Sequence, residues 1–237
     1  MGGLRIDGQA FPCFTAPAPD AIMNQTEGGI GMVIGVMQAS SQREKNALLF
    51  EATRTAAAGH EVVNLGVFAE EAVEVSYVET AAAISLMLCA GAIDFAVTGC
   101  SSGQGMALAL NSLPGVLCGY VPTPQDAYLF GRINGGNAAS LPLGLGFGWC
   151  GEINLRATLE KLFDGPFGAG YPPEDADRKR RDAALLKRVR REAVRGWPAL
   201  APLEPELMRR ALGRANVRRF LLERGTDADV LRLAREI

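Results

Sequence analysis

From residue 31 onward, short apolar runs of strand length alternate with longer segments that have the composition of helices. The clearest helix is an Ala-rich segment from about Tyr77 to Ala90, which Gly91 ends. The runs are apolar throughout, as expected for parallel strands covered by helices on both faces. We therefore predict an α/β fold, a doubly wound five-stranded parallel sheet of strand order 2-1-3-4-5 with helices on both faces. Its strands are expected at residues 32–37, 61–65, 93–98, 116–121 and 138–143.

The chain divides into three parts by composition. Residues 1–30 contain three prolines and few periodic apolar positions, and are predicted to form an N-terminal arm. Residues 31–172 form the predicted α/β domain, with ligands expected at the carboxyl ends of the first and third strands, where the strand order switches. Residues 173–237, broken by Gly and Pro, are predicted to form a helical C-terminal extension. Because the extension has few large apolar stretches, we expect it to dock on the core or on a partner subunit.

Charge is unevenly distributed along the chain. Residues 172–237 carry a formal +6 and residues 1–171 carry −8, so the two parts are expected to attract each other. The net charge of −2 argues against a nucleic-acid-binding protein. The sequence has no run of about 18 apolar residues, so no transmembrane helix is expected. The N-terminus lacks the basic start and apolar core of a secretory signal.

Cysteine usage indicates the compartment. The five cysteines are scattered and odd in number, which predicts reduced thiols in a cytoplasmic protein instead of a disulfide framework. The chain has one histidine and no Cys/His metal spacing, so no metal site is expected.

The segment most indicative of chemistry is TGCSSGQG, residues 98–105, which follows a buried strand and opens a helix. Such a turn aims backbone N–H groups and the positive end of a helix at one point, where an anion or a thiolate is stabilised. A thiol at Cys100 and a hydroxyl at Ser102, together with these amides, can remove a proton and hold the resulting oxyanion. The same pattern also fits a tight turn around a small buried thiol. A nucleotide site is less well supported, because the glycines lack the G-x-G-x-x-G spacing.

A resemblance favours the chemical interpretation. The stretches TGCSSGQGMALALNSLPGV, NGGNAASLPLG and FDGPFGAGYP resemble the family of ribose-5-phosphate isomerase B and galactose-6-phosphate isomerase, from about Met32 to Pro172. The chain resembles a longer branch of that family with a C-terminal helical extension. The resemblance implies aldose–ketose isomerisation of a sugar phosphate through an enediolate. It also implies a dimer or a tetramer with sites between subunits, and no metal or nucleotide cofactor, and we predict a homodimer for this chain.

The resemblance assigns roles to particular residues. Cys100 matches the family's base, and Ser102 matches a Thr that cradles the enediolate oxygen with the amides of Gly103 and Gly105. The remaining substrate-binding candidates are Tyr77, Asn111, Asn134, Asn137 and Gln38, the last standing where the family has the His of an Asp-His pair.

Two departures bear on the substrate. The family's ring-opening His falls on Ile133, and its phosphate-holding Arg falls on Tyr171. Candidate replacement cations are Arg43, Lys45 and Arg132, or a cation from a partner's extension. The departures leave two alternatives open: an isomerase or epimerase of an unphosphorylated or acidic sugar, and a non-catalytic sugar-binding relative. Intact Cys100 and Ser102 favour an enzyme over the binding relative.

Overall fold

The computed structural model describes residues 31–237, and its centre is a five-stranded parallel sheet. Strand β1 (Val33–Gln38) lies between β2 (Glu61–Asn64) and β3 (Phe95–Cys100). Strand β5 (Ala138–Pro142) pairs with β3, and β4 (Cys118–Tyr120) forms the edge beside β5. The predicted α/β class is confirmed. The predicted N-terminal arm, residues 1–30, lies outside the described residues.

The predicted strand order needs one correction. The order is β2-β1-β3-β5-β4, so the last two strands are exchanged relative to the prediction. Strand β5 is buried along four of its five residues, whereas β4 has only three residues and ends at the exposed Tyr120. A short, partly exposed strand suits a sheet edge and a fully buried one suits the interior. Both segments are apolar in sequence, so the pattern of apolar residues did not distinguish them.

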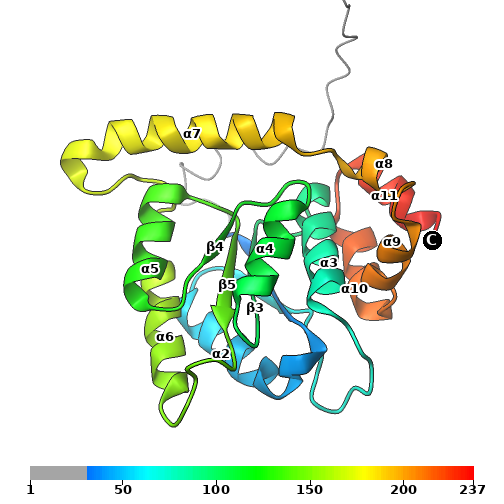
Figure 1. The fold of residues 1–237 in the computed structure, drawn as a ribbon, viewed down its shortest axis with the longest axis horizontal. Coiled ribbons are helices and arrows are strands. Elements are labelled where there is room, and N and C mark those ends of the chain that lie inside the picture. The colour runs from blue at the N-terminus through cyan, green and yellow to red at the C-terminus, as the bar shows by residue number, and fades with distance from the viewer. Residues whose placement is uncertain (1–30) are drawn as a thin grey trace, which may run out of the picture.

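The helices form two layers, one on each face of the sheet (Figure 1). Helices α3 (Tyr77–Ala90) and α4 (Gln104–Ser112) contact each other on one face. Helices α2 (Asn46–Ala56), α5 (Pro124–Leu129) and α6 (Gly151–Leu162) cover the other face. This distribution is what right-handed crossovers require for the observed strand order, because connections that run in opposite directions along the sheet place their helices on opposite faces.

Two shorter helical turns precede α2 and follow α5. The 3-10 turn η2 (Ser40–Lys45) leads from β1 into α2. The π-helical turn η3 (Phe130–Asn134) extends α5 and ends at Gly135, which adopts a positive φ of 54°.

Helix α3 is apolar on all sides because it is covered on all sides. Ser76 caps its N-terminus in a capping box with Glu79, and Gly91 ends it with a left-handed conformation. Eleven of its 14 residues are buried. The sheet covers one side, and helices of the C-terminal extension cover another. An all-round apolar helix is typical of such a central position.

The C-terminal extension packs on the core of its own chain (Figure 1). Trp197 is fully buried against α3, and its Nε1–H donates to Ser85 Oγ at 2.9 Å. The part of the extension around Trp197 therefore docks on the core of its own chain, which is one of the two expected arrangements. The extension contains η4 (Pro173–Asp175), α7 (Ala176–Ala193), α8 (Trp197–Leu200), α9 (Pro205–Ala211), α10 (Ala215–Arg224) and α11 (Ala228–Arg235).

Helix α7 is attached differently from the others. It crosses the top of the molecule in Figure 1 and none of its residues is buried. Two of its arginines contact the core: Arg180 donates to the carbonyl of Ala169, and Arg190 donates to those of Val116 and Leu113. Three apolar side chains are about half exposed on this helix, namely Leu185, Leu186 and Val189.

Within the part of the chain that the structure describes, no helix has the length and apolar character needed to span a membrane.

Candidate active site

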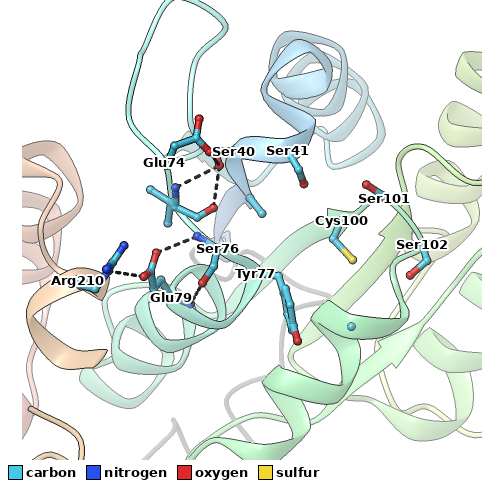
Figure 2. Close-up of a pocket in the computed structure, with 13 residues that line it drawn as sticks. Ser40, Ser41, Glu74, Ser76, Tyr77, Glu79, Cys100, Ser101, Ser102 and Arg210 are labelled. Carbon is cyan, nitrogen blue, oxygen red and sulfur yellow. Dashed lines mark hydrogen bonds and ion pairs between the residues drawn. The ribbon is translucent and has the colours of Figure 1, made fainter. Parts of the chain in front are cut away.

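A cavity of about 570 Å³ lies where β1 and β3 end, at the predicted position. Four segments line it: the turn after β1, the start of α3 with the loop before it, the turn after β3, and α9 of the extension (Figure 2). The lining residues are Ala39, Ser40, Ser41, Glu74, Val75, Ser76, Tyr77, Glu79, Cys100, Ser101, Ser102, Gly105 and Arg210.

Cys100 is the last residue of β3 and is 9% exposed. Figure 2 shows its thiol, the Ser102 hydroxyl and the Tyr77 ring facing the same space. The loop after β5 braces this turn, because the carbonyl of Cys100 accepts from Leu143 N–H and that of Ser101 accepts from Gly144 and Leu145 N–H. From the other side, Gln42 Nε2 donates to Ser101 Oγ at 2.9 Å. The thiol is therefore held on a rigid turn with little exposure to solvent.

The turn leads directly into the N-terminus of α4. Gly103 is the N-cap residue, with a φ of 74°, and a Cβ there would lie 2.8 Å from the Leu141 carbonyl carbon. Ser102 Oγ accepts from the N–H of Gln104 at 3.3 Å. The Tyr77 ring lies beside Gly105, 3.5 Å from where a Cβ would be, which is an ordinary van der Waals distance. An oxygen atom bound beside Cys100 therefore faces the amides and the positive end of α4.

A second helix N-terminus borders the cavity. Tyr77 begins α3, and its side chain is 44% exposed. The Glu79 carboxylate accepts from the N–H of Ser76 at 2.8 Å and pairs with Arg210 of α9, whose Nε lies 2.5 Å from Glu79 Oε1. Neither Glu79 nor Arg210 was among the predicted site residues. The Ser-x-x-Glu spacing of a capping box marks Glu79 in the sequence, but no local signal marks Arg210.

Three predicted binding residues have their side-chain groups engaged elsewhere. Gln38 is fully buried, donates to the carbonyl of Val67 at 2.7 Å and accepts from Asn46 Nδ2 at 3.0 Å. Asn111 donates to the carbonyl of Cys118 and accepts from its N–H. Asn137 accepts from Leu117 N–H and donates to the carbonyl of Gly115. All three connect loops of the core, and none lines the cavity in this chain.

The remaining candidates are also separate from the cavity. Asn134 is exposed at the end of η3, and Gly103 contributes backbone beside the lining residues. Tyr171, where the resemblance predicts the family's Arg, packs edge-on against Tyr128 with ring centroids 5.5 Å apart. Ile133 is half-buried in η3.

None of the three predicted replacement cations lines the cavity. Arg43 donates to the carbonyls of Ser40, Glu71 and Val73 and pairs with Glu74. Lys45 lies 4.1 Å from the centre of the Phe147 ring. Arg132 is buried, which lowers its pKa, and it donates to the carbonyl of Gly165. Among the described residues, the cation that lines the cavity is Arg210.

The described residues contain no group of three or more His, Cys, Asp or Glu side chains that could hold a metal ion. The groups that line the cavity include the Cys100 thiol, serine hydroxyls, the Glu74 carboxylate and the ion pair of Glu79 with Arg210 beside Tyr77.

Comparison with known proteins identifies the class. Residues 34–163, more than half of the chain, match the ribose/galactose isomerase family. The fold and the thiol-bearing turn at the end of β3 agree with this match. The protein is an aldose–ketose isomerase, and the chain belongs to the ribose/galactose isomerase family.

Two solved structures resemble the chain over almost their whole length. A ribose-5-phosphate isomerase from Vibrio parahaemolyticus is 35% identical, with a TM-score of 0.82, covering 87% of this chain and 99% of its own. A 4-deoxy-L-threo-5-hexosulose-uronate ketol-isomerase complexed with a tartrate is 33% identical, with a TM-score of 0.81, covering 87% of this chain and 100% of its own. Comparison with curated proteins gives no match.

A shorter relative shares the fold alone. The type B ribose 5-phosphate isomerase from Trypanosoma cruzi is 20% identical, with a TM-score of 0.53, and covers 66% of this chain and 97% of its own.

Proposed function

We propose that Cys100 is the base that moves a proton between C2 and C1 of an open-chain sugar. The observation that carries this proposal is the position of its thiol: in the cavity, at the end of β3, directly before the N-terminus of α4. Ser102 and the amides of Gly103 and Gly105 are proposed to hold the oxygen that becomes negative.

The reaction follows from the chemistry of these groups. The thiolate takes the proton from C2 of the aldose, and the electrons of that C–H bond form the C1–C2 double bond of an enediolate. The same proton then returns to C1. The proton on O2 passes to O1, and the hydroxyls that line the cavity can relay it. The enediolate oxygen must be stabilised, and losing one such donor typically reduces the rate about 10²–10³-fold.

The substrate proposed here is an unphosphorylated, open-chain sugar acid. Ile133 replaces the family's ring-opening His, and a hydrocarbon side chain cannot transfer a proton. The substrate named for the 33% identical ketol-isomerase has no hydroxyl on C4 or C5, so its C1 aldehyde cannot form the usual furanose or pyranose ring. A substrate of this kind needs no ring opening. The absence of the His is therefore consistent with it.

A sugar phosphate is the second candidate. The 35% identical Vibrio parahaemolyticus protein is called a ribose-5-phosphate isomerase, which supports it. The cavity in this chain favours it less, because its two carboxylates, Glu74 and Glu79, are already paired with Arg43 and Arg210, and among the described residues no further cation lines the cavity to meet a phosphate. A phosphate ester carries about −1.5 to −2 at pH 7.

The test is a panel of sugars in deuterated water, followed by NMR for exchange at C2. We expect the highest exchange rate with 4-deoxy-5-keto hexuronates, lower rates with aldoses that form rings, and the lowest with ring-locked pyranosides. The expected order follows the fraction of open-chain carbonyl. A faster reaction of ribose 5-phosphate than of the keto acid would favour the second candidate. No exchange with any sugar would contradict the proposed function.

We also propose that the protein is a homodimer with α7 in the interface. Arg180 and Arg190 attach α7 to its own core, whereas its apolar residues Leu185, Leu186 and Val189 are about half exposed. A basic helix with an apolar stripe complements the acidic residues 1–171 of a second copy. The exposed position of Asn134 is consistent with a contribution to the partner's cavity.

Sedimentation of a variant tests this arrangement. Changing Leu185, Leu186 and Val189 together to Gln is expected to weaken dimerisation at least ~10-fold, because burying three aliphatic side chains stabilises an interface by several kcal/mol. Leu203→Gln, at a site 61% exposed but away from α7, is the control. A wild-type monomer, or a triple variant that dimerises normally, would show that α7 does not form the interface.

The cytoplasm is the proposed location. Cys100, Cys118 and Cys150 are free cysteines in the described part of the chain, which is consistent with a reducing compartment.

A further inference from the structure

We infer that Arg210 forms a carboxylate-binding subsite at the end of the cavity away from Cys100. This inference rests on the proposed function, in which the substrate is a sugar acid. Figure 2 shows Arg210 and Cys100 at opposite ends of the lining, with Ser76 and Tyr77 between them. A chain molecule whose aldehyde end lies at Cys100 therefore extends toward Arg210, and the subsite receives its acid end.

The guanidinium of Arg210 has N–H donors that its ion pair with Glu79 does not use. Its Nε makes the ion pair with Glu79 Oε1, which leaves the two Nη atoms available to a ligand. Arginine presents five N–H donors in a planar fork, and its Nη pair matches the two oxygens of a carboxylate. The Arg210 side chain is 56% exposed, so a ligand in the cavity can reach it.

The protein holds Arg210 in place before a ligand arrives. Glu79 is only 12% exposed, and its second oxygen accepts from the N–H of Ser76, which fixes the carboxylate that holds Arg210 Nε. Helix α9 is anchored by buried Met208 and Ala211 on either side of Arg210. Beyond α9, Arg214 donates to the carbonyls of Leu65 and Gly66 at 2.6 and 2.7 Å. A side chain already ordered loses less entropy when it binds.

The charge of the lining selects a monoanion. Glu74 pairs with Arg43 and Glu79 pairs with Arg210, so the lining carboxylates and their partners balance. One carboxylate in the subsite adds one negative charge, which the N-termini of α3 and α4 help to offset. A phosphate brings a second negative charge next to Glu79, with no further lining cation to meet it.

The subsite belongs to the extension and not to the family core. Arg210 lies outside residues 34–163, which match the family. The resemblance noted in the sequence places the family's phosphate-holding Arg at Tyr171. In this proposal the C-terminal extension supplies the contact to the anionic group of the substrate. That contact prefers a carboxylate, whereas the family's Arg holds a phosphate.

The test compares Arg210→Gln with Arg209→Gln. Arg209 is the matched control, because it is on the same helix and 58% exposed but pairs with Glu206 and does not line the cavity. Two readouts are used: binding of tartrate, by calorimetry, and the ratio of C2 exchange rates for an aldohexuronate and the matching aldohexose. Arg210→Gln is expected to weaken tartrate binding and to lower the acid-to-neutral ratio, each by about 10- to 100-fold, as for loss of a charge-assisted bidentate contact. Arg209→Gln is expected to change the tartrate affinity and the acid-to-neutral ratio by less than ~3-fold each.

A further variant and the wild-type activity distinguish failure of the subsite proposal from failure of the proposed function. Arg210→Lys keeps the charge but loses the fork, so an intermediate loss supports the subsite. Equal ratios in wild type and Arg210→Gln, or equal losses in Arg210→Gln and Arg209→Gln, would overturn it. If the wild type exchanges the C2 proton of no sugar, the proposed function is contradicted. The carboxylate subsite is then tested by tartrate binding alone, compared between the wild type and Arg210→Gln.

Discussion

Replacing Cys100 by Ala is expected to reduce C2 proton exchange by at least ~10³-fold. A positioned general base contributes about 10²–10⁴ in rate, and no other titratable side chain lining the cavity replaces the thiol at this turn. The substitution removes one sulfur atom from a side chain that is 9% exposed, so the fold is expected to persist. Tartrate binding is expected to change by less than ~3-fold, because Arg210 is unaffected. NMR exchange in deuterated water and calorimetry measure the two effects.

Cys118→Ala is the matched control for this experiment. Cys118 is on β4, does not line the cavity, and burial raises the pKa of its thiol to about 12. Its loss is expected to leave the exchange rate within ~3-fold of the wild type. Iodoacetamide is expected to modify Cys100 faster than Cys118, and bound tartrate is expected to slow that modification. Exchange by Cys100→Ala at the wild-type rate would show that another group is the base.

Replacing Trp197 by Ala is expected to lower the free energy of unfolding by about 3–5 kcal/mol, the usual cost of removing a buried aromatic side chain. Trp197 is fully buried in the cluster that joins the extension to α3. The change also leaves Ser85 Oγ without the indole N–H that donates to it at 2.9 Å. Because α3 starts at the cavity with Tyr77, the variant is expected to lose activity at lower denaturant concentration as well. Urea unfolding followed by circular dichroism measures the change.

Trp149→Ala is the control, because it changes the same residue type at a position that is 98% exposed. Its effect on unfolding is expected to stay within about 0.5 kcal/mol. Equal stability of wild type and Trp197→Ala would mean that the extension does not stabilise the core. In that case the placement of Arg210 by α9 would also lose its support.

Features that depend on neighbouring residues in the chain were predictable from the sequence. The predicted helix from Tyr77 to Ala90 matches α3, because a capping box and a C-terminal glycine define its ends locally. The thiol-bearing turn is at the end of β3 as expected, although the strand continues through Cys100, two residues beyond its predicted end. Apolar runs were sufficient to predict parallel strands, since burial on both faces requires apolar residues at every position.

Features that depend on distant residues were decided only by the tertiary structure. The order of β4 and β5 depends on which strand has two neighbours, and both segments are apolar in sequence. Gln38 follows a predicted strand end, yet its amide is satisfied by Asn46 and Val67 in the interior.

Arg210 is the clearest case. It is separated by 131 positions in the chain from Glu79, and in the sequence it is one of 17 basic residues of the extension. The sequence by itself determined the α/β class, the helix ends and the turn that carries Cys100, because those follow from local hydrogen bonding and periodic burial. Which cation reaches the cavity followed only from the packing of α9 on α3, since the pairing energy of a surface arginine depends on the partner that tertiary contacts bring to it.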